Sequence, residues 1–141
     1  MSLRSAISEQ EFDGILAAMP MAAFFGVRTE KLSRGVAILS LPFSAKLLRP
    51  GHTHSGPSLM AAVDLAAYAA LLSLDRDHIS SLTADLTINF LKRPPSTDLL
   101  AECNILTIDS VRAVAKAVIF PFREPDDVIC SSICTYSIHQ G

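Results

Sequence analysis

The amino-acid sequence predicts a single α+β domain in which about six strands surround one central, buried helix. The first observation behind this prediction is the segment from Gly56 to Leu74, whose apolar residues would cover every side of a helix, as is typical of a buried one. The second is the alternation of apolar and polar residues from Thr83 to Leu91, which indicates a half-buried strand. The third is the length of 141 residues, which fits one domain over residues 1–141.

The first half of the chain is predicted to hold a short helix and two strands. Ser8-Glu9-Gln10-Glu11 has the pattern of a capping box, and Pro20 follows the expected end of the helix, so residues 1–20 form an N-terminal helical segment. Two predicted strands and a loop rich in Pro, Gly, His and Ser follow it: Phe24 to Glu30, Val36 to Phe43 and Leu47 to Pro57.

Four further strands are predicted after the buried helix. The first would carry apolar residues on one face and polar residues on the other, and Pro94-Pro95 ends it. Its apolar face comprises Ala84, Leu86, Ile88 and Phe90. The other three predicted strands are Leu99 to Ile108, Val111 to Phe120 and Val128 to Ile138.

The composition favours a chain that buries apolar surface against copies of itself. Hydrophobic residues make up 50% of the sequence and charged residues 18%, with a mean hydropathy of +0.37. This is more apolar material than one small domain can hide, and it excludes intrinsic disorder. A net charge of −2, the absence of a basic run and the absence of Trp argue against a nucleic-acid partner.

A cytoplasmic location without a membrane partner is expected. The three cysteines, Cys103, Cys130 and Cys134, have no ligand or disulfide spacing and are predicted to be small core residues in a reducing compartment. Acidic residues near the N-terminus argue against an export signal. The longest apolar stretch, Leu59 to Leu72, has 14 residues interrupted by Asp64, fewer than the roughly 20 that a membrane span needs.

Asp64 is the most informative residue, because it is the only residue between Leu59 and Leu74 that is charged at neutral pH. Burial of an unpaired carboxylate costs several kcal/mol by order of magnitude, and no Arg or Lys lies one helical turn away. Two interpretations remain open at this point. Asp64 is either a structural carboxylate with a partner from elsewhere in the fold, or a group held ready for chemistry.

Gly56 stands at the start of the same helix, where unpaired N–H groups suit a polarised carbonyl. Eight residues separate it from Asp64, about 12 Å along the axis at ~1.5 Å per residue. The two groups therefore cannot act on one carbonyl within one chain. A two-fold dimer with antiparallel helices would bring Gly56 of one chain close to Asp64 of the other.

Residues 49–91 resemble the hot-dog fold acyl-CoA thioesterases, specifically the phenylacetate-pathway (PaaI-like) group. The matching stretches are the loop before the helix, the helix segment that carries Asp64, and the strand after it: Arg49-Pro50-Gly51-His52-Thr53-His54-Ser55-Gly56-Pro57, Leu59 to Ala66, and Thr83 to Leu91. The resemblance implies a six-stranded antiparallel sheet wrapped around the helix. It also implies homodimers, often paired into tetramers, with active sites at the dimer interface.

The same resemblance implies hydrolysis of an acyl-CoA thioester without a cofactor. Asp64 would be the general base or nucleophile, Gly56 of the opposite subunit would polarise the carbonyl through its N–H, and Thr83 would help to orient water. The helix start departs from the family pattern, since Ser55-Gly56-Pro57 replaces the usual His-Gly-Gly. In addition, His54 is displaced by one residue and Arg49 stands where many members carry Asn.

Several residues near this helix are candidates for substrate binding. Lys92 and Arg93 could contact the phosphates of coenzyme A or form a solvated strand end. Tyr68, one turn after Asp64, could hydrogen-bond the carboxylate or simply fill space. The complete set of substrate-binding candidates is Arg49, His54, Ser55, Pro57, Tyr68, Lys92 and Arg93.

Two alternatives to a thioesterase stay open. One is an acyl-thioester hydratase or dehydratase that uses His54 with a carboxylate, and the other is a non-catalytic acyl-CoA-binding protein. A metal site is not expected, because His52 and His54 lack a third ligand at a convincing spacing. His78 and His139 are predicted to lie on the surface without a role.

Overall fold

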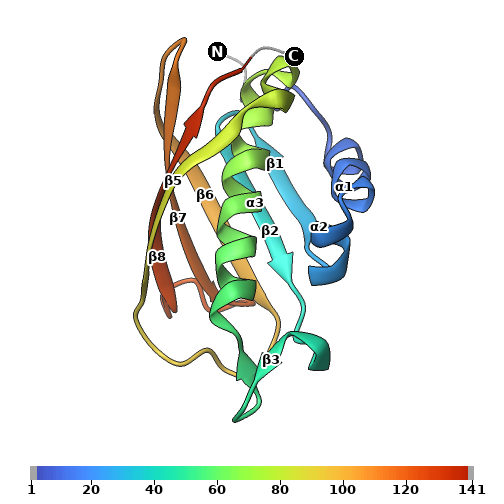
Figure 1. Cartoon of the computed structure of the whole chain (residues 1–141), viewed down its shortest axis with the longest axis vertical. Helices are drawn as coiled ribbons and strands as arrows, with labels where there is room; N and C mark the ends of the chain where they lie inside the picture. The colour runs from blue at the N-terminus through green and yellow to red at the C-terminus, as the bar shows by residue number, and fades with distance from the viewer. Residues whose placement is uncertain (1–2, 140–141) are drawn as a thin grey trace.

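The helix α3 (Gly56–Leu74) runs along the concave face of a six-stranded antiparallel sheet in a computed structural model that describes residues 3–139 (Figure 1). Residues 1–2, the start of the predicted N-terminal helical segment, lie outside the described residues. The strand order is β1-β2-β6-β7-β8-β5. The sheet strands are β1 (Arg28–Ser33), β2 (Val36–Leu41), β5 (Leu82–Phe90), β6 (Leu99–Ile108), β7 (Arg112–Pro121) and β8 (Cys130–Ser137).

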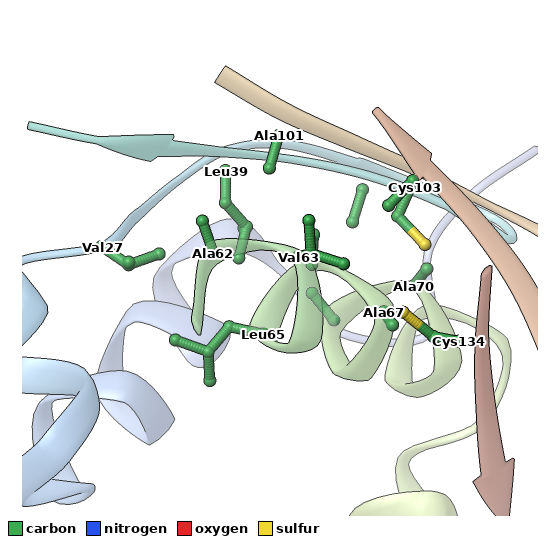
Figure 2. Packing of buried hydrophobic residues seen from close by; sticks show 14 of the residues in the cluster. Val27, Leu39, Ala62, Val63, Leu65, Ala67, Ala70, Ala101, Cys103 and Cys134 are labelled. Carbon is green, nitrogen blue, oxygen red and sulfur yellow. The ribbon is translucent and has the colours of Figure 1, made fainter. Parts of the chain in front are cut away.

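The boundaries of α3 agree with the prediction, because Ser55 caps the helix and Pro57 occupies its first turn. The alanines of α3 allow the sheet to approach closely. Val63, Ala67 and Ala70 are buried beneath Leu39 of β2 and Cys103 of β6 (Figure 2). By length and composition α3 could cross a membrane, yet 67% of that stretch is buried inside this domain, as expected for a core helix.

The three cysteines are free and fully buried, which confirms their prediction as core residues. Burial raises the pKa of the Cys130 thiol to about 11 and that of Cys134 to about 12, and it also raises the pKa of Cys103. These thiols are therefore protonated and shielded at neutral pH.

The prediction that Phe24 starts a strand is wrong. α1 (Glu9–Ala18), opened by the predicted Ser8–Glu11 capping box, is followed at once by a second helix, α2 (Pro20–Phe25). Pro20 both ends the first helix and stands at the first turn of the second, where its fixed φ suits a helix. Gly26 then terminates α2 with a φ of 71°, a left-handed conformation that glycine adopts without strain.

The predicted loop between residues 47 and 57 contains short regular elements. The 3-10 helix η1 (Ala45–Leu47) leads into a two-residue hairpin of β3 (Leu48–Arg49) and β4 (Thr53–His54). A second 3-10 helix, η2 (Arg76–Ser80), follows α3 and buries His78, so the prediction of a surface position for His78 is wrong. His139 is exposed, as predicted.

The two edge strands of the sheet differ in how they are covered. On β1, the side chains of α1 accept hydrogen bonds from the outer amides: Asp13 Oδ1 from Thr29 N–H at 2.8 Å, and Glu9 Oε2 from Leu32 N–H at 3.0 Å. Such pairing blocks an edge against further strands. No element of residues 3–139 pairs with the outer edge of β5.

β5 is also more exposed than the predicted half-buried strand. Its register with β8 shifts between Thr83 and Asp85, and only Leu86 and Ile88 are partly buried. Phe90 at its end is 51% exposed. The alternation therefore describes a strand that is only partly covered within one chain.

Candidate active site

The carboxylate of Asp64 is held by two hydroxyl groups that donate to the same oxygen. The Thr83 hydroxyl lies 2.7 Å from Asp64 Oδ1, and the Tyr136 hydroxyl lies 2.9 Å from it. The Tyr136 hydroxyl oxygen also lies 3.1 Å from the backbone carbonyl oxygen of Asp64. No hydrogen bond from residues 3–139 engages Oδ2, so one oxygen is fixed and the other is left to act on a bound molecule.

Tyr136 reaches this position because β8 pairs with β5 and sets Tyr136 opposite Thr83. Its side chain is buried at 5% exposure, and burial, followed by the negative charge of Asp64, raises its pKa well above the ordinary value of 10.0. The phenol is therefore a permanent donor over the physiological pH range. Sequence reasoning missed this residue, which lies 72 positions from Asp64 and has no local motif.

Tyr68 does not form the hydrogen bond to the Asp64 carboxylate that was one of its two predicted roles. Its hydroxyl donates to the carbonyl oxygen of Ile79 at 2.6 Å, and its ring stacks on that of Tyr136 with centroids 6.1 Å apart and planes at 16°. The ring also contacts Phe12 of α1. Tyr68 thus supports the ring of Tyr136 and does not bind the carboxylate.

An apolar cavity of about 550 Å³ opens beside Asp64. Of the residues that the structure describes, only Asp64 and Thr83 are polar and line this cavity. The others, from α2, α3, β5 and the junction before α2, are Met19, Met21, Ala22, Phe25, Pro57, Met60, Ala61, Leu65 and Leu86. This volume falls within the roughly 300–1,000 Å³ that is common for small-molecule sites. Pro57, predicted to bind substrate, lies on this cavity.

A second hollow, of about 480 Å³, lies around the start of α3 and is called the basic groove here. It brings together five predicted site residues: Arg49, His54, Gly56, Lys92 and Arg93. Pro50, Thr53, Leu59, Phe90 and Pro94 complete its lining. The groove therefore combines three cationic side chains with the N-terminus of a helix, a combination that suits phosphate.

The cations of the basic groove differ in how they are held. The guanidinium of Arg93 donates to the carbonyl oxygen of Gly51 at 2.6 Å, and Gly51 adopts a φ of 97°. A Cβ at that glycine would come within 2.9 Å of the guanidinium, so glycine is needed both for the turn and for the contact. Lys92 forms an ion pair with Asp127, whereas Arg49 is exposed.

His54 is a buried residue, not part of an exposed loop at the mouth of a site. Only 2% of its surface is exposed, its Nε2 lies 2.8 Å from the carbonyl oxygen of Thr97, and its ring packs edge-on against Phe43. Its Nδ1 has no partner among the described residues. Because His54 lines the basic groove and Asp64 lines the apolar cavity, one chain does not pair them.

Ser55 serves as the N-cap of α3. Its hydroxyl accepts a hydrogen bond from the Ser58 N–H at 3.4 Å and lies 3.2 Å from the Ser58 hydroxyl. The next residue, Gly56, makes no hydrogen bond through its N–H to any other described residue. Within residues 3–139 there is no group of three or more His, Cys, Asp or Glu residues arranged to hold a metal ion.

The two hollows occupy opposite ends of β5. Asp64 is bonded to Thr83 near the beginning of the strand, and Gly56 faces the ring of Phe90 at its end, 3.7 Å from where a Cβ would stand. α3 and β5 therefore run in opposite directions. The carboxylate and the helix N-terminus form two separate halves within one chain.

Comparison with known proteins places this chain in a family. The model of the Thioesterase superfamily matches residues 50–130, more than half of the chain. The chain belongs to the Thioesterase superfamily. The predicted resemblance is thereby confirmed at the level of the superfamily, and the matched segment includes α3 with Gly56 and Asp64.

Relatives with related sequences carry esterase names. A protein named "Putative esterase SSO1253" from Saccharolobus solfataricus is 36% identical over 61% of this chain and 57% of its own length. A "Putative esterase" from Sulfurisphaera tokodaii is 32% identical over 66% of this chain and 71% of its own length. The match thus spans little more than half of the first of these relatives. Together with the family, these names support hydrolysis of a thioester or ester.

Solved structures identify the architecture as the hot-dog fold. A thioesterase family protein from Silicibacter pomeroyi superposes with a TM-score of 0.84 at 22% identity, covering 94% of this chain and 98% of that one. The PaaI protein of Escherichia coli, from the phenylacetic acid degradation operon, superposes with a TM-score of 0.77 at 16% identity, covering 95% and 98%. The predicted α+β hot-dog fold is confirmed.

Proposed function

We propose that this protein hydrolyses the thioester of an acyl-CoA at a site assembled from two copies of the chain. The observation that carries the proposal is the carboxylate of Asp64, which is fixed through Oδ1 by Thr83 and Tyr136 at the edge of an apolar cavity. A carboxylate held in this way beside a bound acyl group can act on the thioester carbonyl without first having to be oriented.

The two halves of the site meet if β5 pairs with β5 of a second copy. Antiparallel pairing centred midway between Thr83 and Phe90, near Leu86 and Thr87, would set Phe90 of one chain opposite Thr83 of the other. Gly56, which packs on Phe90, would then approach the partner's Asp64. The open edge of β5 and the blocked edge of β1 both favour this pairing. Dimers would pair further into tetramers, as the family resemblance implies.

In the proposed reaction, water adds to the thioester carbonyl and the carbon–sulfur bond breaks, giving a carboxylic acid and the free thiol of coenzyme A. Asp64 Oδ2 either takes the proton from the attacking water or attacks the carbonyl carbon itself. The Gly56 N–H of the opposite subunit donates to the carbonyl oxygen as negative charge develops on it. Thr83 and Tyr136 keep the carboxylate in place.

The basic groove would receive the phosphates of coenzyme A. Arg49, Lys92 and Arg93 supply positive charge there, and the positive end of the α3 helix dipole adds to it. We also propose a cytoplasmic location, since the three cysteines are unpaired thiols.

Release of free thiol from short, medium, long and aromatic acyl-CoAs tests this proposal. Asp64→Asn should lower kcat by about 10²- to 10⁴-fold, the usual contribution of a general base. Glu30→Gln, which alters an exposed carboxylate on β1 at the opposite edge of the sheet, serves as the control and should retain activity. Full activity in Asp64→Asn would contradict the role of Asp64 as general base or nucleophile.

Three further measurements separate the two catalytic routes and the alternative functions. Incorporation of oxygen-18 from water into Asp64 during a single turnover, or trapping of an acyl-enzyme, would identify direct attack. Thermal stabilisation by acyl-CoA without any thiol release would indicate the binding protein instead. Hydration of an enoyl-CoA would indicate a hydratase, although the separation of His54 from Asp64 within one chain weighs against it.

A further inference from the structure

Three methionines converge on the cavity beside Asp64. The sequence has four methionines, and every one after residue 1 lines this cavity: Met19 at the junction of α1 and α2, Met21 in α2 and Met60 in α3. All three are solvent-exposed, Met21 at 74%. Long, unbranched thioether side chains can reorganise around apolar partners of different shapes. Their convergence indicates a surface suited to variable apolar groups.

Charge is as informative as shape in this cavity. Among residues 3–139, Asp64 is its only charged lining residue, and no Arg, Lys or His of this part of the chain lines it. An acyl group that ended in a carboxylate would lose its water, find no cation to pair with, and be repelled by Asp64. The basic groove of the same chain, by contrast, holds three cations at the other end of β5, and in the proposed dimer the groove of the second copy would lie with its Gly56 on the coenzyme A side of the thioester. The apolar part of a substrate would thus bind in the cavity, and its anionic part would bind in a basic groove.

We infer that the cavity between α2 and α3 is the acyl-binding site, and that it selects uncharged, apolar acyl groups against acyl groups with a terminal carboxylate. The inference rests on the proposed function for the thioester, and it adds the substrate class. The short helix α2, which flanks α3 in Figure 1, forms one wall through Met21, Ala22 and Phe25. Leu65 of α3 and Leu86 of β5 contribute to the rest.

Binding is measured first without hydrolysis. The full chain, labelled with ¹³C at the methionine methyl groups, is titrated with S-octyl-CoA, a thioether that cannot be hydrolysed, and with its ω-carboxylated counterpart. The methyl resonances of Met19, Met21 and Met60 should shift with S-octyl-CoA at concentrations where the ω-carboxylated compound leaves them unchanged. Equal shifts with both compounds, or none with either, would overturn the inference.

A charge-introducing variant then tests selectivity in hydrolysis. Met21→Lys places a cation at the rim of the cavity, on a side chain exposed enough for the substitution to leave the fold intact. The ratio of kcat/KM for an ω-carboxylated acyl-CoA over the unsubstituted one should rise by about tenfold, as expected for one new partly exposed ion pair. Val111→Lys, at an exposed turn between β6 and β7, is the control and should leave the ratio unchanged.

Failure of the acyl-site inference can be distinguished from failure of the proposed hydrolysis. Methionine shifts with S-octyl-CoA but no thiol release from any acyl-CoA would support the acyl site and contradict the proposed hydrolysis. Thiol release with no methionine shifts would support hydrolysis and place the acyl group elsewhere. An unchanged substrate ratio in Met21→Lys would also count against the site assigned here.

Discussion

Tyr136 of β8 donates its hydroxyl hydrogen to Oδ1 of Asp64 across 2.9 Å, joining the last strand of the sheet to the central helix. The same oxygen accepts from Thr83. Two donors on one carboxylate oxygen leave the other oxygen as the reactive one and restrict rotation of the side chain. This contact therefore resolves the two interpretations of Asp64 in part, because the partly buried carboxylate has identified partners and still keeps a free oxygen.

Tyr136→Phe removes one donor while keeping the ring. We expect kcat to fall by about tenfold, the effect of one hydrogen bond to a charged group, with little change in KM. The control is Tyr68→Phe, which loses a hydrogen bond to Ile79 and keeps the stacking on Tyr136. Its kcat should remain close to wild type. Equal losses in the two variants would show that Tyr136 acts through fold stability and not through Asp64.

The N–H of Gly56 is tested by a pair of substitutions. Gly56→Pro removes the N–H at a first-turn position that proline tolerates, and it should lower kcat by about 10²-fold, as for loss of one oxyanion donor. Gly56→Ala keeps the N–H, and its Cβ would stand 3.7 Å from the Phe90 ring, an ordinary contact. It should stay within a few-fold of wild type. Similar losses in both variants would indicate a steric effect.

Mixed dimers distinguish a shared site from a site within one chain. Asp64→Asn and Gly56→Pro chains, each nearly inactive alone, should recover activity when they are mixed after dissociation. Random pairing makes half of the dimers heterodimers, each with one intact site, so about a quarter of wild-type activity is expected. No recovery, with heterodimers demonstrated by mass spectrometry, would contradict the two-chain site.

Arg49→Gln tests the basic groove. The substitution should raise KM for an acyl-CoA by about fivefold through loss of one phosphate contact, and leave kcat unchanged. The same acyl group on N-acetylcysteamine, which lacks phosphates, should be hydrolysed equally by variant and wild type. Arg34→Gln, between β1 and β2 and away from the groove, is the control. An equal KM increase for both substrates would mean that Arg49 does not contact phosphate.

The buried thiols predict lower stability at alkaline pH. Burial holds the pKa of Cys130 at about 11 and that of Cys134 at about 12, against an ordinary value of 9.0. Between pH 9 and 10 the unfolded chain loses thiol protons that the folded chain keeps, so the free energy of unfolding falls as pH rises. Each thiol contributes a slope of at most about 1.4 kcal/mol per pH unit.

Urea unfolding at pH 8, 9 and 10 measures this slope. Cys134→Ala should make it shallower, because one of the protonated thiols is removed. Below pH 9 none of these thiols contributes, since folded and unfolded chains are both protonated there. A free energy of unfolding that stays constant from pH 8 to 10 would contradict the raised pKa values of these thiols.

Much of the fold could be predicted from the sequence because its signals are local. The apolar surface of α3 and the turn residues around it lie within one segment, and the boundaries Gly56 and Leu74 follow from them. Asp64 stood out for the same reason, as one charge in an apolar helix. The start of the strand predicted from Phe24 to Glu30 was placed too early, because the apolar residues there suit a strand as well as a helix, and β1 begins only at Arg28. Pro20 and Gly26 decide in favour of α2.

The partners of the site residues depended on long-range contacts. Tyr136 meets Asp64 through the register of β8 against β5, and that register follows from pairing across the whole sheet. His54 is buried because Phe43 and Thr97, from distant segments, close around it. Periodicity and spacing along the chain determine which elements form and which residue carries the charge. Packing between distant elements determines which groups touch it, because those contacts have no fixed separation in sequence.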